Sequence, residues 1–207
     1  MTDLVILGVP PSAYVRTARM ICANKGVDHT LQPVDFRSPA YRAHHPFGRM
    51  PALQHGDVAL YESLAIGVYI DGAFDGPALQ PTDVVARARM MQWISVVNDY
   101  IYDQVVGCCV AERFVKPMRG LEPDEEKIAA AVPKMAAQLD VIEAGLAGDY
   151  LCGDAVTLAD LFLAPVLHYL AATPEGEQLL PSRSAIGDWM GRMEETSGFG
   201  EINKLGP

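Results

Sequence analysis

The feature that most constrains this chain is a segment rich in Gly, Asp and Pro, residues 71–82 (DGAFDGPALQPT), that separates two differently patterned parts. Before it, short apolar runs alternate with helical periodicity, whereas after it the apolar residues recur at helical spacing throughout. Because such residues mark linkers between compact regions, we expect a boundary here. The sequence therefore predicts a small α/β domain at residues 1–74, a linker at 75–82 and an all-helical domain at 83–207.

The first part predicts the element order β-α-β-α-β-β-α. Its first apolar run, LVILG, ends in Gly and two prolines, which is typical of a buried strand that enters a loop. Pro33, within the strand predicted at 28–35, lacks a backbone donor, so this strand is expected at the edge of a sheet. In chain order the predicted segments are a strand at 4–8, a helix at 13–25, a strand at 28–35, a helical turn at 38–45, hairpin strands at 50–54 and 58–61, and a helix that begins at Glu62.

The second part predicts four helical stretches. Pro133 predicts a kink or a break in the second of them. Thr157 and Asp160 have the spacing of a reciprocal N-terminal cap, so Asp160 is expected to be structural. The predicted stretches are 83–115, 123–147, 157–172 and 182–196.

Charge and cysteine content exclude several classes of function. The formal net charge is −10, and residues 81–207 carry −9 of it, with 10 basic and 19 acidic side chains. Without a basic surface, nucleic acid is not an expected partner. The four cysteines, Cys22, Cys108, Cys109 and Cys152, lack metal-ligand spacing, so no metal is expected.

The same features predict where the protein works. Cys22 and Cys109 fall in apolar helical runs, which indicates buried free thiols and a reducing compartment. The N-terminus Met-Thr-Asp-Leu has no basic n-region, and no apolar run reaches membrane-spanning length. We therefore expect a cytoplasmic protein with no membrane association.

Three local motifs lie in the loops of the first part. They are Pro11-Ser12-Ala13-Tyr14-Val15-Arg16 after the first strand, Pro46-Phe47-Gly48-Arg49-Met50-Pro51-Ala52-Leu53 before the hairpin, and Tyr61-Glu62-Ser63 at the next helix start. In this order, and followed by helices with the Thr157–Asp160 cap, they resemble the cytosolic glutathione transferase family, in its serine-type, bacterial-like form. The resemblance covers nearly the whole chain.

The resemblance implies a thioredoxin-like N-terminal domain, an all-α C-terminal domain, glutathione as co-substrate and a homodimer. It implies that Ser12 activates the glutathione thiol. A hydroxyl that donates to the thiolate stabilises the charged form, and the N-terminus of a helix acts in the same direction. The residues alone favour a helix N-cap for Ser12, the commonest role of serine before a helix, and the two roles are compatible.

Other members of the family use a different activating residue. Tyrosine-type classes carry it at the end of the first strand, where this chain has Leu7-Gly8, and the cysteine-type loop residue is absent. Tyr14 remains an alternative activator, although the wall of the second-substrate pocket is its expected place.

The resemblance also assigns the residues that would bind the rest of glutathione. A cis peptide before Pro51 would let the Met50 backbone pair with the cysteinyl part. Ser63 and Glu62, at a helix N-terminus, would bind the γ-glutamyl carboxylate and ammonium. Each of these residues could instead be a plain strand or capping residue.

The remaining candidates are less constrained by the sequence. Arg37 and Arg49 are the basic residues available for the glycyl carboxylate, or else they are solvated surface charges. Tyr102, in an aromatic-rich helical run, is the candidate for the second-substrate pocket. The adjacent His44 and His45 are expected to be surface or loop residues.

Three functions follow from these assignments. The first is conjugation of the glutathione thiolate to a small hydrophobic electrophile, as in detoxification. The second is peroxidase, isomerase or dehalogenase chemistry on the same scaffold. The third is a non-catalytic binding or assembly module, which the intact set of Ser12, Met50-Pro51 and Glu62-Ser63 disfavours.

Overall fold

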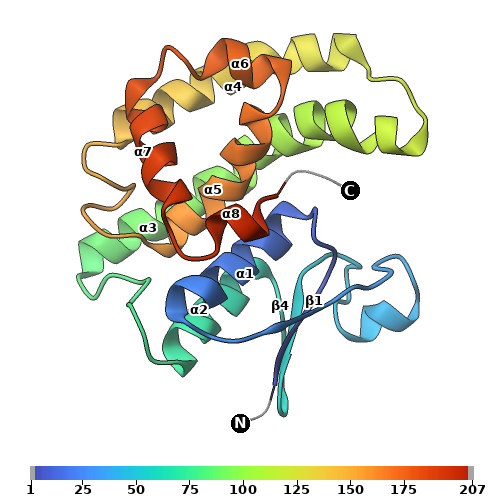
Figure 1. Ribbon diagram of the computed structural model, residues 1–207, viewed down its shortest axis with the longest axis vertical. Coiled ribbons are helices and arrows are strands. Elements are labelled where there is room, and N and C mark those ends of the chain that lie inside the picture. Colours follow the sequence, from blue (N-terminus) through green and yellow to red (C-terminus); the bar gives the residue numbers. More distant parts are fainter. Residues whose placement is uncertain (1–2, 205–207) are drawn as a thin grey trace. The chain divides into compact units, whose positions relative to one another are not determined.

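The computed structural model describes residues 3–204, which divide into two compact units (Figure 1). The first unit comprises residues 3–80 together with 195–204, and the second comprises residues 81–194. Within the described residues, no helix is both long enough and apolar enough to span a membrane.

A four-stranded mixed sheet forms the base of the first unit. Its strands are β1 (Leu4–Leu7), β2 (Thr30–Gln32), β3 (Ala52–His55) and β4 (Val58–Tyr61), in the order β2-β1-β3-β4. β1 is parallel to β2 and antiparallel to β3, and β3 and β4 form the predicted hairpin. β2 is an edge strand, as the proline that follows it predicted.

Two helices pack together against this sheet. They are α1 (Ala13–Lys25) and α2 (Ser63–Ala73), which lie side by side in Figure 1. α1 ends at Gly26, whose φ of 68° places it in the left-handed region that favours glycine. The predicted helical turn is a short 3₁₀-helix, η1 (Ala40–Ala43). The thioredoxin-like order predicted from the resemblance is confirmed.

The C-terminal segment belongs to the first unit. Its short helix α8 (Phe199–Ile202) contacts α1, and Phe199 and Ile202 are only 4% and 6% exposed. The sequence placed the whole of 83–207 in the helical domain, whereas the helical unit ends at Glu194. A four-residue helix is too short to produce a recognisable apolar period, so the sequence did not reveal its packing.

The second unit is entirely helical, as predicted. Its elements are α3 (Val84–Val96), the π-helical segments η2 (Val97–Ile101) and η3 (Asp103–Val115), the 3₁₀-helix η4 (Pro117–Arg119), α4 (Glu125–Gly145), α5 (Leu158–Ala171), α6 (Pro174–Leu179) and α7 (Ser184–Glu194). Of the predicted kink or break at Pro133, the break does not occur, because α4 continues through it. Pro133 is exposed, so water can reach the carbonyl of Ala129 that loses its helical donor.

The π-helical segments were not predicted, but a pattern in the sequence fits them. The buried residues Val97, Ile101, Val105 and Cys109 recur every four residues. In a regular α-helix of 3.6 residues per turn, such a row would rotate around the axis by about 40° at each step. A π-helical turn is wider and rotates such a row in the opposite sense, so the four-residue spacing lies between the two helix types. η3 contacts α4 and α5.

The buried carboxylate of Asp160 organises the centre of the helical unit. One oxygen accepts hydrogen bonds from the Leu151 amide and the Trp189 indole, each at 3.0 Å. The other accepts from the Thr157 amide at 2.9 Å and the Thr157 hydroxyl at 2.8 Å. The predicted reciprocal cap of α5 is present, and its acid also holds the loop before α5 and the helix α7.

Candidate active site

The register of the sheet gathers the predicted motifs at one end of it. Leu7, the last residue of β1, pairs with Ala52 at the start of β3, which in turn pairs with Tyr61 at the end of β4. On its other side, Leu7 pairs with Gln32 at the end of β2. The Ser12 loop, the Met50-Pro51 segment, the Glu62-Ser63 turn and the segment that carries Arg37 therefore all adjoin the same row of residues.

Ser12 caps the N-terminus of α1. Its Oγ accepts a hydrogen bond from the Val15 amide at 3.4 Å, and its own amide donates to the Val9 carbonyl at 3.1 Å. The side chain is half-buried. Because the cap uses the hydroxyl oxygen as an acceptor, its hydrogen remains available to donate to a bound group. The capping role is thus present and leaves a catalytic role open.

A glycine lets α1 approach β1 closely. A Cβ atom on Gly8 would lie 2.4 Å from a methyl carbon of Val15, so no larger residue fits without movement. Val15 is fully buried, and its amide is the donor to Ser12. Close contact of strand and helix therefore fixes the turn that presents the serine.

The Met50-Pro51 peptide bond is cis, as the resemblance predicted. Pro51 is buried and Met50 is half-buried. Both residues precede β3, which starts two residues later than the predicted strand. The Met50 backbone thus lies just outside the sheet.

The turn at Glu62 has an unusual backbone. Glu62 has a φ of 71°, and it is the only non-glycine residue with positive φ among residues 3–204. Such conformations are costly for residues with a Cβ, and they cluster at functional sites. Ser63 opens α2, and no side chain caps this helix. The helix N-terminus therefore remains a place where an anionic group is stabilised.

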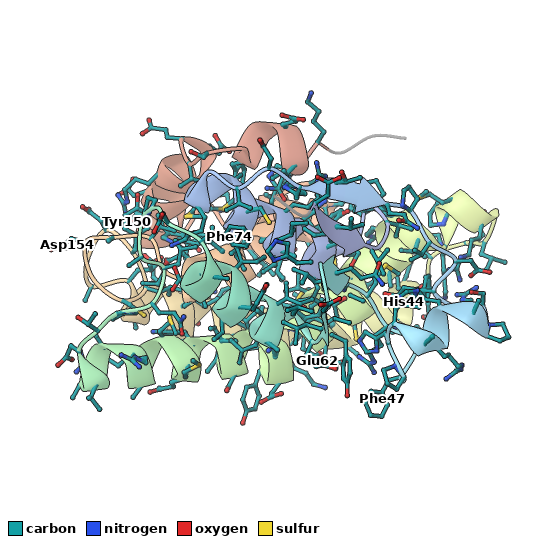
Figure 2. The ribbon with its side chains drawn as sticks, turned by 90° about the horizontal axis from the view of Figure 1, so that it is seen from below. His44, Phe47, Glu62, Phe74, Tyr150 and Asp154 are labelled. Atoms are coloured by element: carbon teal, nitrogen blue, oxygen red, sulfur yellow. The ribbon has the colours of Figure 1, made fainter. Side chains whose placement is uncertain are left out.

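His45 lies in the loop after η1, one of the two placements expected for it, but its side chain is only 2% exposed. Its Nε2 lies 3.9 Å from a carboxylate oxygen of Glu62, and its ring packs 5.1 Å from the Tyr61 ring centre. Burial lowers the pKa of the imidazole, so the ring is neutral near pH 7. Figure 2 labels Glu62 together with Phe47, which is 70% exposed. No periodic signal surrounds the two histidines, so the burial of His45 could not be predicted from the sequence, whereas His44 is half-buried.

The two candidate arginines are both exposed. Arg37 follows β2, and its guanidinium carbon lies 5.3 Å from the centre of the Phe36 ring. Arg49 directly precedes Met50. Their assignment to the glycyl carboxylate stays a prediction, as does the binding role of each residue at this end of the sheet.

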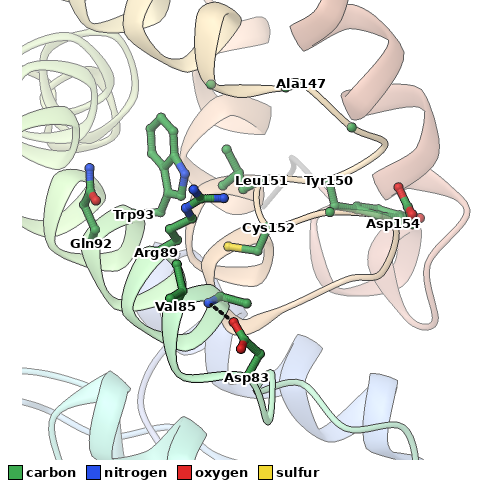
Figure 3. Close-up of a pocket in the computed structure, with 14 residues that line it drawn as sticks. Asp83, Val85, Arg89, Gln92, Trp93, Ala147, Tyr150, Leu151, Cys152 and Asp154 are labelled. Atoms are coloured by element: carbon green, nitrogen blue, oxygen red, sulfur yellow. Dashed lines mark hydrogen bonds between the residues drawn. The ribbon is translucent and has the colours of Figure 1, made fainter.

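The candidates for the second substrate fall in different units. Tyr14 is the second residue of α1, while Tyr102 lies between η2 and η3 in the helical unit, and both are half-buried. The helical unit also contains a cavity of about 570 Å³ between the first half of α3 and the loop after α4 (Figure 3). None of the predicted site residues lines that cavity.

The two buried cysteines of the chain do not supply a reactive thiol. Cys22 and Cys109 are free and fully buried, as predicted. Burial raises the pKa of Cys22 to about 12 and that of Cys109 to about 11, so both remain protonated. Cys22 is the one cysteine of residues 3–80 and 195–204, so within that unit a thiol nucleophile would come from a substrate.

Comparison with known proteins agrees with this geometry. The family model described as glutathione S-transferase, N-terminal domain, matches residues 7–78, and that described as glutathione S-transferase, C-terminal domain, matches residues 109–192. Glutathione S-transferase F10 of Arabidopsis thaliana is 31% identical over 202 residues, which cover 94% of each chain.

Solved structures extend the comparison over the whole fold. The structure of glutathione S-transferase III in apo form has 32% sequence identity and a TM-score of 0.89, and 99% of each chain is covered. The theta class glutathione S-transferase of Xanthomonas axonopodis pv. citri, solved with glutathione bound, has 25% identity and a TM-score of 0.88 over 100% of this chain and 99% of that one. The serine-type, bacterial-like subclass stays a prediction. The family itself is shown by these matches: the chain belongs to the glutathione S-transferase family and is a glutathione transferase.

Proposed function

We propose that this chain binds glutathione along the end of its sheet and that Ser12 activates the thiol for attack on a hydrophobic electrophile. The observation that carries the proposal is the pairing of Leu7 with Ala52 and of Ala52 with Tyr61. That register brings the serine loop, the cis-proline segment and the start of α2 to the same end of the sheet. The bacterial neighbour solved with glutathione bound supports the same ligand.

The chemistry at Ser12 follows from the pKa of a thiol. A free thiol has a pKa of about 8.5, so glutathione is mostly protonated near pH 7, whereas the thiolate is the nucleophile. A hydrogen bond from the Ser12 hydroxyl to the sulfur stabilises the thiolate. The free amides at the start of α1 favour the same negative charge. Each unit by which the thiol pKa falls corresponds to about 1.4 kcal/mol of stabilisation of the thiolate relative to the thiol.

The other residues at this end of the sheet bind the rest of glutathione. The Met50 backbone pairs with the cysteinyl part, and Ser63 with the first amides of α2 binds the γ-glutamyl carboxylate. Glu62 accepts from the γ-glutamyl ammonium, while Arg37 or Arg49 pairs with the glycyl carboxylate. The strained φ of Glu62 and the uncapped start of α2 support the assignment of this turn.

The helical domain would contribute Tyr102 to the electrophile pocket, and α1 would contribute Tyr14. In this proposal residues 1–74 bind glutathione, residues 75–82 link the domains and residues 83–207 serve the second substrate, apart from the C-terminal segment that packs on α1.

The working form is a cytoplasmic homodimer that acts in detoxification. The large apolar side chain of Phe47 is 70% exposed, which supports a contact between the first unit and a second copy of the chain.

Titration calorimetry with glutathione, followed by conjugation of a generic aryl halide, tests the function. We expect saturable glutathione binding and enzyme-dependent formation of the aryl conjugate. Absence of glutathione binding would refute the proposed site. Binding without conjugation would refute the conjugating activity and favour peroxidase or isomerase assays.

Ser63→Ala is expected to raise the KM for glutathione by about 10- to 100-fold and to leave kcat nearly unchanged. The change removes one hydrogen bond to a carboxylate, which is worth about 1.5–3 kcal/mol. Initial-rate kinetics with glutathione as the varied substrate measure it. Ser184→Ala, at the exposed start of α7, is a matched control that should change neither constant. An equal KM for Ser63→Ala and wild type would remove Ser63 from the site.

Arg37→Ala and Arg49→Ala, compared singly, should identify the partner of the glycyl carboxylate. Because both side chains are exposed, the loss is expected to be about 1 kcal/mol or less, roughly fivefold in KM for glutathione. The effect should shrink at high salt, since screening weakens exposed ion pairs. Arg119→Ala, an exposed arginine of the helical unit, serves as the control. If neither variant changes KM, both arginines are surface charges.

A further inference from the structure

A buried arginine connects the serine loop to the C-terminal segment within the first unit. Arg16 is 3% exposed and lies one helical turn after Ser12, whose carbonyl accepts from its amide at 2.9 Å. Its Nε donates to the Pro10 carbonyl at 3.2 Å. Its Nη2 donates to the Lys204 carbonyl at 3.0 Å, and its Nη1 to the Asn203 carbonyl at 3.5 Å. One guanidinium thus bridges the loop and the chain end.

On the loop side, Arg16 binds the Pro10 carbonyl, which lies two residues before Ser12. Pro10 lies inside the turn that the hydrogen bond from the Ser12 amide to the Val9 carbonyl closes. The two prolines of this turn have fixed φ and no N–H group, so they offer few other anchors for the backbone. The planar guanidinium, with donors in fixed directions, holds the Pro10 carbonyl in one orientation.

The other end of the bridge is also fixed. Asn203 is 1% exposed, and its side-chain amide donates to the Phe199 carbonyl at 3.2 Å and to the Met20 sulfur at 3.2 Å. Phe199 and Ile202 bury the apolar side of α8. The carbonyls that receive Arg16 are therefore held by contacts to α1 itself.

We propose that the C-terminal segment acts through Arg16 as a positioning device for Ser12, so that residues 203–204 set how well the serine activates glutathione. The proposal rests on the proposed role of Ser12. Arg16 is a positioning residue and has no contact with substrate in this role. Loss of the bridge frees the Pro10 carbonyl, widens the range of Ser12 positions and weakens the hydrogen bond from its hydroxyl to sulfur.

The test compares three variants of the full protein: a chain that stops after Ile202, Arg16→Gln and Arg16→Lys. The chain that stops after Leu205 is the matched control, because it retains both receiving carbonyls. For each, the ultraviolet absorption of the thiolate is titrated with pH on the glutathione complex, and kcat and KM for glutathione are measured.

We expect the first two variants to raise the apparent pKa of bound glutathione by about 0.5–1 unit. The corresponding loss of thiolate, and of kcat, below that pKa is about 3- to 10-fold. KM should change less than twofold, because the Glu62-Ser63 turn is intact. Arg16→Lys keeps the positive charge but lacks the planar set of guanidinium donors. The thiol pKa and kcat of this variant should therefore lie between those of the first two variants and those of wild type. The stop after Leu205 should match wild type.

Combining Arg16→Gln with the stop after Ile202 tests whether they share one bridge. The double variant should be no worse than the more affected single variant, since both changes break the same connection. Additive losses, or thiolate titrations equal to wild type in both single variants, would overturn the proposal. Asn203→Ala, which keeps the chain intact, replaces the truncation if the shorter chain does not fold, and it should shift the titration in the same direction.

Ser12→Ala distinguishes failure of the bridge from failure of the proposed function. If Ser12→Ala raises the thiol pKa and the bridge variants do not, the positioning role alone is refuted. If Ser12→Ala also leaves the titration unchanged, Ser12 is not the activator, and the proposal that rests on it falls as well.

Discussion

Ser12→Ala is expected to bind glutathione with nearly wild-type affinity and to conjugate it about 100-fold more slowly near pH 7. The change removes the only feature of Ser12 that would act on the reacting sulfur, a preorganised hydroxyl donor, and such donors are worth about 10²–10³ in kcat. The thiol of the bound glutathione should titrate at a higher pH. Consequently the deficit in kcat should narrow as pH rises toward the unassisted thiol pKa of about 8.5. A pH profile of kcat for both proteins measures this.

The helix cap complicates the alanine variant, and two further substitutions resolve it. Ser12 caps α1 through the Val15 amide, and loss of a cap costs about 1 kcal/mol of stability. Ser12→Asn keeps a capping oxygen but has no hydroxyl, so it should be stable and slow. Ser12→Thr keeps both features and should retain much of the rate. If Ser12→Ala, which has no side-chain donor, conjugates as fast as wild type, the serine is only a cap, and Tyr14→Phe becomes the next variant.

The motifs were predictable because each lies where a strand meets a loop. The apolar runs that end at Leu7 and Tyr61 fixed the strands, and alternation around the Gly56 turn fixed the hairpin. Once those strands pair, the neighbours of their last residues must meet. The sequence pattern therefore predicted the strands and loops, and the pairing of the strands brings the loops to one end of the sheet.

What escaped prediction depends on long-range packing. His45 has no apolar period around it, and its burial follows from the rings of Phe47 and Tyr61 that pack against it. Arg16 appeared as one letter of a loop motif, while its partners lie 187 and 188 residues later. The π-helical segments differ from an α-helix in their i→i+5 hydrogen bonds and wider turn, a difference that short apolar patterns cannot distinguish. Tertiary contacts decided all three.

Asp160→Ala is expected to destabilise the protein by about 3–5 kcal/mol. The carboxylate is fully buried and accepts four hydrogen bonds, from Leu151, Trp189 and the two donors of Thr157. Each buried donor left without an acceptor costs about 1–3 kcal/mol, and relaxation recovers part of the sum. At this chain length 1 kcal/mol lowers Tm by about 2–4 °C, so Tm should fall by roughly 10 °C.

Because the Trp189 indole donates to the same carboxylate, tryptophan fluorescence during denaturant unfolding reports the change directly. Asp160→Asn keeps one acceptor oxygen and should lose about half as much stability as Asp160→Ala, since the amide can still receive Leu151 and Trp189. Asp154→Ala, at an exposed position of the preceding loop, controls for loss of a carboxylate and should unfold like wild type. Equal stability of Asp160→Ala and Asp154→Ala would mean that water replaces the carboxylate. In that case α5 would be held by its apolar residues alone, eleven of which are buried, and the cap would only define where the helix begins.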